Sequence, residues 1–308
     1  MHQSSVIDTL PFHDVTLADR DDIMAVTLHS GRRNCNLSIA NLLGWQFLLH
    51  TKVCILPDTA LFQYHIDGWS AYFISSSTLP CNEIIEALRR HAADEGNALR
   101  IIALEDTWAE DLMGRYPQAE MEPVRNRYDY IYLREQLEQL EGKQLKAKRN
   151  HVNKFLSEHP AYRYCDLTPA LFDQCLDLAQ QWRTTTLHDN PTYGDTLESE
   201  HIMLERLFKY WDQLPLSGGA IFVDEELVAF TCGSPVTNDT FDVCIEKANR
   251  HIDGAFNIIN QQFVKHLPPQ YKYINREEDM GLEGLRKAKL SYHPHILLSY
   301  NTITIPRP

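Results

Sequence analysis

The order of hydrophobic segments in the second half of the chain limits the folds that the sequence can adopt. A strand-like run leads into two segments with the apolar spacing of helices. Three strand-like runs joined by short turns follow, and a helix, a strand, a second helix and a last strand complete the order. The expected elements are Tyr162–Cys165, Leu171–Trp182, Glu198–Trp211, Gly218–Val223, Leu227–Gly233, Thr240–Glu246, Gly254–Val264, Tyr271–Asn275, Leu282–Leu290 and His295–Thr304. One sheet covered by helices on both faces buries such an order economically.

The first half repeats this order imperfectly. Its expected elements are Leu17–Leu28, Ile39–Leu48, Lys52–Leu56, Ala60–His65, Ser70–Ser75, Pro80–Ala93, Leu99–Leu104, Thr107–Met113 and Tyr128–Leu133. We therefore predict an α+β protein made of two tandem domains, residues 1–127 and 128–308, with the end of the Tyr128–Leu133 strand as the alternative boundary. Each domain is expected to hold a mixed, mostly antiparallel sheet flanked by helices. No low-complexity linker separates the halves, so we expect them to pack tightly.

The composition is that of a globular protein in a reducing compartment. Hydrophobic residues make up 44% of the 308 residues and charged residues 23%, as in proteins with a real core. No run approaches the roughly 20 apolar residues of a membrane span, and Met1–Val6 lacks the features of an export signal. The seven cysteines are scattered and form no C-x-x-C pair. We predict a cytoplasmic protein with reduced thiols, no transmembrane segment and no structural zinc site.

The chain is strongly acidic, with one basic exception. Its 42 acidic and 29 basic residues give a net charge of −13, which argues against broad nucleic-acid binding because that affinity comes from clustered lysine and arginine. Residues 142–155, however, carry five basic residues, Lys148 and Arg149 among them, and no acid. This run is either the solvated face of a helix or a patch that binds a phosphate-bearing substrate.

A second concentration of charge lies at the junction between a predicted strand and helix, at residues 275–289. Asn275, Glu277 and Asp279 could recognise a cationic group such as an ammonium. In the alternative, Asp279 caps the helix and the glutamates are solvated. The acids are consecutive and no histidine lies at ligand spacing, so no metal site is expected. Arg286 and Lys289 share a helix face and could clamp a phosphate or carboxylate, or only complement the helix dipole.

Several short segments carry a family resemblance. They are Tyr128–Tyr132, Lys148–Phe155, Glu246–Ala248, Gly254–Ala255, Asn260–Gln261 and the opening block of the chain. Together they resemble the family of phosphatidylglycerol lysyltransferase C-terminal-like domains over nearly the whole chain. The element order is also similar to that of the acyl-CoA N-acyltransferase (GNAT) fold, so the resemblance implies two tandem GNAT-like domains. The better-known relatives move an aminoacyl group from aminoacyl-tRNA to a lipid and usually carry a membrane-embedded region that is not found in this sequence.

The resemblance also implies a donor-binding loop. In the GNAT fold the donor's phosphates bind where a helix follows the third adjacent strand, because the free N–H groups of a helix start favour anions. The residues expected there are Lys247, Asn249, Arg250, Gly254 and Ala255. The usual acyl-CoA loop, R/Q-x-x-G-x-G/A, is matched only by Arg250 and Ala255, and Asp253 stands at the first glycine position. The alternative is an ordinary helix capped by Asp253.

Two residues are candidates for catalysis. Glu246 ends a strand at the point where the strands of this fold diverge, and it could take a proton from an acceptor amine or hydroxyl; the alternative is an ion pair with Lys247 or another base. Tyr292 follows a helix whose end commonly carries the acid for the leaving group in this fold, although it could be a packing residue. In the first half, Ser75–Pro80 contains no glycine or arginine, so that half is expected to be structural or acceptor-binding.

Two functional classes follow from these observations. The first is an acyl- or aminoacyltransferase that acts on a small or phosphate-bearing acceptor, with acyl-CoA or aminoacyl-tRNA as its donor. The second is a non-catalytic tandem GNAT-fold module that binds a ligand or a partner protein. The charge concentrated between Asn275 and Lys289 favours the enzyme, and the imperfect phosphate loop favours the binding module.

Overall fold

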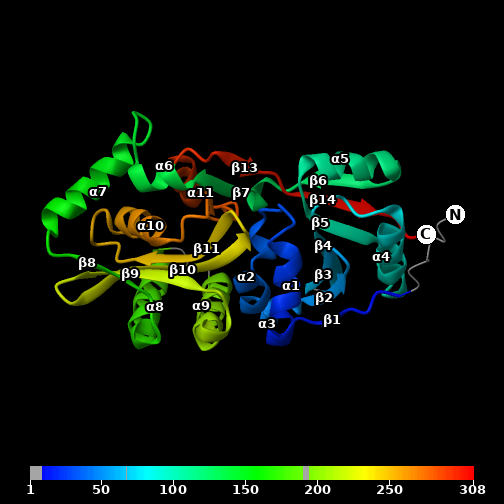
Figure 1. The fold of residues 1–308 in the computed structure, drawn as a ribbon, viewed down its shortest axis with the longest axis horizontal. Coiled ribbons are helices and arrows are strands. Elements are labelled where there is room, and N and C mark those ends of the chain that lie inside the picture. The colour runs from blue at the N-terminus through cyan, green and yellow to red at the C-terminus, as the bar shows by residue number, and fades with distance from the viewer. Residues whose placement is uncertain (1–8, 67, 190–193) are drawn as a thin grey trace.

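The structure, a computed structural model, describes residues 9–66, 68–189 and 194–308. It contains two seven-stranded sheets, which lie side by side along the long axis of the molecule (Figure 1). The segment Met1–Val6, on which the expectation of no export signal rests, lies outside the described residues. No helix within the described ranges is both long and apolar enough to cross a membrane.

The N-terminal sheet has the strand order β1-β2-β3-β4-β5-β14-β6. Its strands are β1 (His13–Asp14), β2 (Lys52–Leu56), β3 (Thr59–Ile66), β4 (Trp69–Ser76), β5 (Leu99–Leu104), β6 (Glu120–Pro123) and β14 (Asn301–Ile305). The helices of this half are α1 (Arg20–Thr27), α2 (Ile39–Gly44), α3 (Gln46–Leu49), α4 (Asn82–Asp94) and α5 (Asp106–Arg115). All neighbouring strands are antiparallel except β4 and β5, which pair in parallel.

The C-terminal sheet has the strand order β13-β7-β12-β11-β10-β9-β8. Its strands are β7 (Asp129–Leu133), β8 (Arg163–Asp166), β9 (Ser217–Val223), β10 (Glu226–Thr237), β11 (Thr240–Ala248), β12 (Tyr273–Asn275) and β13 (Ile296–Leu298). The helices of this half are α6 (Arg134–Gln139), α7 (Lys146–Glu158), α8 (Phe172–Asp189), α9 (Gly194–Lys209), α10 (Ala255–His266) and α11 (Glu283–Leu290). The single parallel pair is again in the middle, between β11 and β12.

The two sheets exchange a strand. β14, from the end of the chain, lies between β5 and β6 in the N-terminal sheet. β7, from the segment that joins the halves, lies between β12 and β13 in the C-terminal sheet. The prediction of one strand over His295–Thr304 is therefore wrong, because Ser299 and Tyr300 separate two short strands that belong to different sheets. The predicted domain bounds stay a prediction, but residues 301–305 belong by pairing to the N-terminal sheet.

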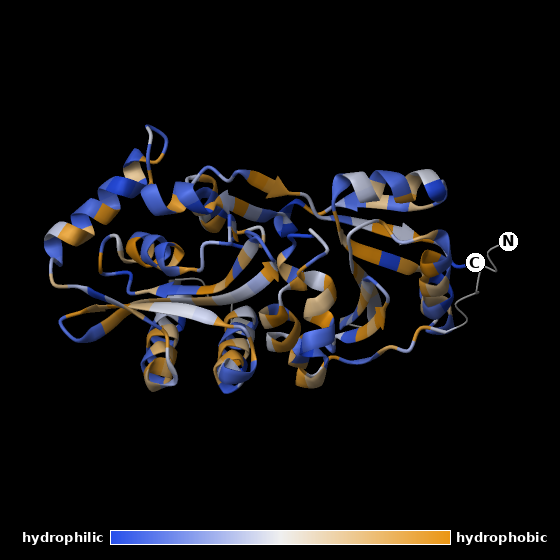
Figure 2. Cartoon of the chain, in the orientation of Figure 1, coloured by the Kyte–Doolittle hydropathy of each residue, from blue (hydrophilic) through white to orange (hydrophobic). Residues whose placement is uncertain are grey.

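Helices cover both faces of the C-terminal sheet. Ile258, Ile259 and Phe263 of α10 pack on one face together with Phe155 of α7. α8 and α9 pack on the other face, where Leu207 contacts a second cluster that includes Phe230 (Figure 1). Figure 2 shows that these helices carry both hydrophilic and hydrophobic residues, as expected for helices with one face on a sheet and the other in water. The predicted layering of a mixed sheet between helices is confirmed for this half.

The local sequence explains the β9–β10 hairpin. Asp224 and Glu225 both have positive φ angles, 49° and 65°, as the two central residues of a type I′ turn require. The turn aligns Val223 with Glu226 and sets the register in which apolar residues of the two strands face the core.

The strands β11 and β12 diverge after a short parallel pairing. Only Thr240–Asp242 pairs with Tyr273–Asn275, while β11 continues to Ala248 beside β10 alone. The chain that follows β12 turns away along β7, with the Arg276 N–H bonded to the carbonyl of Tyr130. Side chains from the last part of β11 and from the segment after β12 can therefore meet between the two backbones.

Candidate functional site

An ion pair spans the divergence of β11 and β12. Nη2 of Arg276, the first residue after β12, lies 2.8 Å from Oε1 of Glu246 near the end of β11. The second carboxylate oxygen of Glu246 accepts a hydrogen bond of 3.2 Å from Nδ2 of Asn260 on α10. The two charged side chains are only 14% and 13% exposed. The alternative expected for Glu246, an ion pair with Lys247 or another base, is therefore met, with Arg276 as the base. Lys247 itself lies 2.5 Å from Oε1 of Glu200.

Two tyrosines and a lysine surround this ion pair. The guanidinium of Arg276 lies 4.9 Å from the ring centre of Tyr292 and 5.8 Å from that of Tyr132. Nζ of Lys148 lies 4.4 Å from the centre of the Tyr292 ring. Burial, followed by the charge of Arg276, lowers the pKa of Lys148. We refer to Tyr132, Lys148, Glu246, Asn257, Asn260, Arg276 and Tyr292 as the Arg276 cluster.

The hydroxyl of Tyr292 is held by α10. Asn257 Nδ2, in the first turn of this helix, donates to the Tyr292 hydroxyl oxygen over 2.5 Å. Burial raises the pKa of Tyr292, so the phenol keeps its proton at neutral pH. Because the oxygen already accepts a hydrogen bond, the hydroxyl hydrogen can be donated to another group.

One nitrogen of the Arg276 guanidinium has no partner. Nη1 is buried and makes no hydrogen bond of good geometry to a described residue, although the guanidinium lies close enough to the Tyr292 hydroxyl to act against the rise in the pKa of that phenol. A buried, unpaired donor is costly in a folded protein, so an unpaired nitrogen on a cation next to Glu246 and Tyr292 suggests that this cluster holds the oxygen atoms of a ligand.

The basic segment before and within α7 divides between site and scaffold. Lys148 belongs to the Arg276 cluster, whereas Arg149 Nη1 donates to the backbone carbonyls of Leu140 and Gly142. Lys154 and His151 both contact the Asp253 carboxylate, at 2.7 and 2.9 Å. The segment is therefore neither only a solvated face nor one continuous phosphate patch.

The predicted donor-binding residues lie on both faces of the sheet. Lys247 points away from Glu246 and stacks on Trp182 of α8, with 3.7 Å between Nζ and the ring centre. Arg250 stacks on the same ring at 4.7 Å and donates to Oγ1 of Thr186. Side chains alternate between the faces of a strand, so Lys247 and Glu246 cannot contact a ligand from the same side.

A pocket of about 420 Å³ lies between α8 and the segment after β11. Trp182, Thr185, Asn249, Arg250 and His251 are among its lining residues. It combines an aromatic ring, a guanidinium and neutral polar groups, which together suit a phosphate or a planar polar ring.

Gly254 and Ala255 begin α10 in a closely packed position. Gly254 is the N-cap residue and has a φ of +80°. A Cβ atom at this position would lie 2.5 Å from the backbone oxygen of His151 on α7. Asp253 forms no cap, since the helix has no side-chain cap and the carboxylate bonds to His151 and Lys154. The expectation of a helix capped by Asp253 is wrong.

Replacing Gly254 with alanine is expected to destabilise the protein and to displace α10 from α7. The left-handed backbone alone costs an alanine about 1–2 kcal/mol, and the contact with the His151 carbonyl adds to it. Urea denaturation of Gly254→Ala against Gly142→Ala separates the two terms, because Gly142 has a φ of +81° and nothing within 4 Å of its added Cβ. An equal loss in both variants would contradict the close approach of the two helices.

Asp279 and Arg286 form a buried structural network rather than a ligand site. Asp279 is fully buried and accepts two hydrogen bonds from Arg286, one from Arg125 and one from the hydroxyl of Tyr130. It also accepts from the Gly281 N–H, whereas the N-cap residue of α11 is Leu282. The expected helix cap at Asp279 is therefore wrong. Nε and Nη2 of Arg286 both donate to Asp279, so neither nitrogen is available to a ligand.

The other predicted residues of this junction lie between the two halves. Asn275 Nδ2 bonds to Oδ2 of Asp129 and to the carbonyl of Arg33, and Glu277 Oε1 accepts from Asn41 over 2.8 Å. Lys289 is turned inward, where Nζ donates to the carbonyls of Arg276 and Glu278. The alternative of solvated glutamates is wrong, because Glu277 bonds to Asn41 and the Glu278 side chain is largely buried. Arg286 and Lys289 bind different groups and do not form one clamp.

Sequence reasoning missed the central residue of the site. Arg276 lies within the charged junction, but its partner Glu246 is thirty positions away. The parallel pairing of β11 and β12 could have indicated the contact. In a parallel pair both strands run in the same direction, so residues after β12 lie beside residues near the end of β11. Asn257 was also missed, and Asn260 was noted only as part of the family resemblance, although their spacing of three places both on one face of α10.

A sequence model of the family described as phosphatidylglycerol lysyltransferase, C-terminal, matches residues 29–302. A crystal structure of a conserved protein of unknown function from Bacteroides thetaiotaomicron is 38% identical to this chain. The match covers 96% of this chain and all of that one, with a TM-score of 0.91.

Two solved structures with far lower identity share the fold. One is the C-terminal domain of a putative lysylphosphatidylglycerol synthetase from Agrobacterium fabrum, 10% identical over 94% of this chain and 92% of that one, with a TM-score of 0.64. The other is L-PGS from Bacillus licheniformis, 12% identical over 97% of this chain and 93% of that one, with a TM-score of 0.65. At these identities the likeness concerns the fold alone.

Proposed function

This chain belongs to the family of phosphatidylglycerol lysyltransferase C-terminal domains, and from that premise we propose that it is an acyl- or aminoacyltransferase whose reaction takes place at the Arg276 cluster. The fold and the family point to transferases of the GNAT type. The family description names an enzyme that transfers a lysyl group, which supports an aminoacyl group as the part transferred.

The unpaired Nη1 of Arg276 carries the proposal. It lies on a buried cation between two diverging strands, next to a carboxylate and a protonated phenol. A positioned cation of this kind stabilises the negative charge that develops on a carbonyl oxygen during acyl transfer. The ion pair with Glu246 and the two tyrosine rings fix the guanidinium in place before a substrate arrives.

The remaining groups suit the proton transfers of the reaction. The nucleophile of the acceptor, an amine or hydroxyl, attacks the donor carbonyl and forms a new C–N or C–O bond. Glu246 takes the proton that the nucleophile loses. The bond between the carbonyl carbon and the leaving oxygen or sulfur breaks, and Tyr292 supplies a proton to that leaving atom. Arg276 neutralises the intermediate oxyanion.

The pocket beside Trp182 is our candidate for the distal part of the donor. Arg250 and Asn249 line it, and the start of α10 with Gly254 and Ala255 follows directly in the chain. Phosphate groups of acyl-CoA or of the 3′ end of aminoacyl-tRNA would find a cation there. Such a donor would pass over the end of β11 to bring its acyl group to Arg276. Lys148, whose Nζ lies over the ring of Tyr292, is our candidate for holding a phosphate on the acceptor.

A thermal-shift comparison tests donor binding. Acetyl-CoA, aminoacyl-tRNA and small aminoacyl phosphates are added to wild type, Arg250→Ala and Lys146→Ala. We expect one donor to raise the melting temperature, since a ligand at about 100 times its Kd adds roughly 2.7 kcal/mol to the stability of the folded state. Arg250→Ala should reduce the shift. Lys146 is exposed on α7, two residues from Lys148, and its replacement should leave the shift unchanged.

Absence of a shift with every donor, at concentrations far above a plausible Kd, would remove the main support for a transferase. A shift of equal size in all three proteins would show that the donor binds elsewhere.

A further inference from the structure

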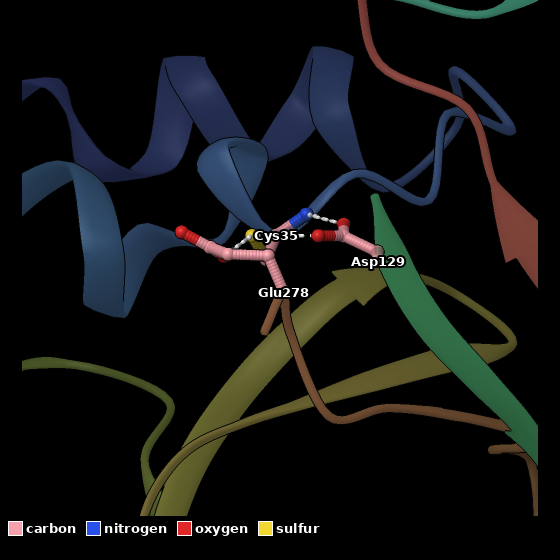
Figure 3. A group of neighbouring side chains, drawn as sticks. All are labelled: Cys35, Asp129 and Glu278. Carbon is pink, nitrogen blue, oxygen red and sulfur yellow. Dashed lines mark hydrogen bonds between the residues drawn. The ribbon is translucent and has the colours of Figure 1, made fainter. Parts of the chain in front are cut away.

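A cysteine and two carboxylates meet where the two halves join. Sγ of Cys35, in the N-terminal half, lies 3.3 Å from Oδ1 of Asp129 at the start of β7 and 3.6 Å from Oε2 of Glu278 after β12. Figure 3 shows the two carboxylates on either side of the sulfur. One ligand atom from each residue lies within 4.8 Å of the other two. Cys35 and Asp129 are buried, and the Glu278 side chain is 16% exposed.

A single thiol proton cannot serve both carboxylates. A thiol has one S–H group, so at any moment one of the two oxygens faces the lone pairs of the sulfur without a hydrogen between them. Loss of that proton would place a buried thiolate against two carboxylates, a contact that a cation bound between them would relieve.

The rest of each carboxylate is already oriented. Oδ2 of Asp129 accepts from the Cys35 N–H and from Asn275, at 2.7 and 2.9 Å. Oε1 of Glu278 accepts from Arg127 over 2.7 Å. In both residues the second oxygen is therefore left facing the sulfur. Metal ligands in proteins are commonly held in this way, by hydrogen bonds to the atom that does not bind the ion.

A neighbouring buried carboxylate, that of Asp242, is also incompletely hydrogen-bonded. Asp242 is fully buried, and its Oδ1 makes no hydrogen bond of good geometry to a described residue, although the Ser38 hydroxyl lies near the carboxylate. Its Oδ2 shares the Asn41 amide with Glu277. Within the described residues, the carboxylates of Asp129, Asp242, Glu277 and Glu278 thus gather around Cys35 and Asn41, and Glu278 pairs with Arg127.

We propose that Cys35, Asp129 and Glu278 bind a divalent metal ion of the Zn²⁺ class, which fastens the N-terminal half to the C-terminal half. Zinc–sulfur and zinc–oxygen bonds of about 2.3 and 2.1 Å at tetrahedral angles place sulfur and oxygen about 3.6 Å apart. The two separations of 3.3 and 3.6 Å agree with that geometry. The thiolate favours Zn²⁺ or Co²⁺ over Mg²⁺ or Ca²⁺, and water completes the coordination.

Binding exchanges a proton for the metal. The ion forms bonds to the sulfur and to one oxygen of each carboxylate, the S–H bond breaks, and the thiol proton passes to solvent. We therefore expect uptake of about one metal ion and release of about one proton per chain in a weakly buffered titration of the metal-free protein. The sequence alone gave no reason to expect this site, because Cys35 and Asp129 lie far from the acidic run in the chain.

Titration of the EDTA-treated full chain with Co²⁺ tests the proposal, followed by absorbance and melting temperature. Wild type should develop thiolate-to-Co²⁺ charge-transfer absorption and a higher melting temperature. Cys35→Ser should lose the absorption, and Glu278→Gln should weaken binding by at least about 10- to 100-fold, the range seen for lesser changes around metal sites. Cys54→Ser is the matched control, since Cys54 is also buried but lies in an apolar cluster; it should bind as wild type does.

If Cys35→Ser does not fold, Glu278→Gln decides the question, because an amide oxygen can still accept the bond from Arg127. Three results would overturn the proposal: no thiolate absorption in wild type, equal affinity in wild type and Glu278→Gln, or stabilisation by ethylamine or lysine with none by Co²⁺ or Zn²⁺. The last result would assign the site to an ammonium group instead.

Discussion

Replacement of Asp279 by alanine is expected to lower the free energy of unfolding by about 2–3 kcal/mol, the upper part of the range for hydrogen bonds to a charged group, because the arginines left behind are each about a third exposed to solvent. The carboxylate is fully buried and accepts hydrogen bonds from Arg125, Arg286 and Tyr130. Its loss leaves the Arg125 and Arg286 guanidinium groups without their shared anion at the junction of β12 and α11. Urea denaturation of the two proteins measures the difference directly.

Asp111→Ala is the matched control for Asp279→Ala. Asp111 also pairs with an arginine, Arg115, but its side chain is 47% exposed, and exposed ion pairs contribute about 1 kcal/mol or less. If Asp279→Ala costs no more than Asp111→Ala, the network around Asp279 does not stabilise the junction.

The same network should respond to acid. Burial raises the pKa of Asp279, but hydrogen bonds from Arg286, Tyr130 and the Gly281 N–H lower it more, so the pKa lies below the usual range of a carboxyl group. The ionised Asp279 carboxylate therefore contributes fully to the free energy of unfolding above the pKa of an aspartate in the unfolded chain, about 4. This contribution is lost as the pH falls towards the lower pKa of Asp279 in the folded state.

Replacement of Arg276 by lysine is expected to lower the rate constant of acyl transfer by about 100-fold or more, the effect of removing one donor that stabilises an oxyanion. Lysine keeps the positive charge beside Glu246, but it lacks the planar group that can hold Glu246 and a ligand oxygen together. The rate is measured with the donor that raises the melting temperature in the thermal-shift comparison.

Arg134→Lys is the matched control for Arg276→Lys. Arg134 forms an ion pair with Glu138 at similar exposure, 15% and 25%, but on α6 and outside the Arg276 cluster. It should transfer at the wild-type rate. The double replacement of Arg276 by methionine and Glu246 by glutamine removes both charges and should fold without restoring transfer. Wild-type activity in that protein would show that the cluster is structural.

The apolar periodicity of the sequence was enough to predict the two sheets and most of their elements. Lys52–Leu56 and Leu99–Leu104 were predicted with their observed bounds. The exchanged strand was not foreseen, because Ile296–Leu298 and Asn301–Ile305 form one nearly continuous β-prone run. Only the partners of each strand show that the run divides between two sheets, and strand partners far apart in the chain leave no local signal.

The charged residues were harder to assign than the apolar ones. Arg286 and Lys289 share a helix face, which suggested a common ligand, yet one binds Asp279 and the other binds backbone carbonyls. The spacing of residues along a helix shows on which face a side chain lies, but not how far it extends or which group it contacts. Glu246 was placed correctly at the divergence of two strands, whereas the identity of its partner depended on a contact across thirty residues.

Mass spectrometry of products tests most directly whether this protein is a transferase or a binding module. The protein is incubated with the donor that stabilises it and with a set of amine and hydroxyl acceptors, both with and without phosphate. We predict a new amide or ester whose mass is the acceptor plus the acyl or aminoacyl group, together with the released donor, and loss of both in Arg276→Lys. A donor that binds at the Arg276 cluster and yet remains intact with every acceptor would contradict the account.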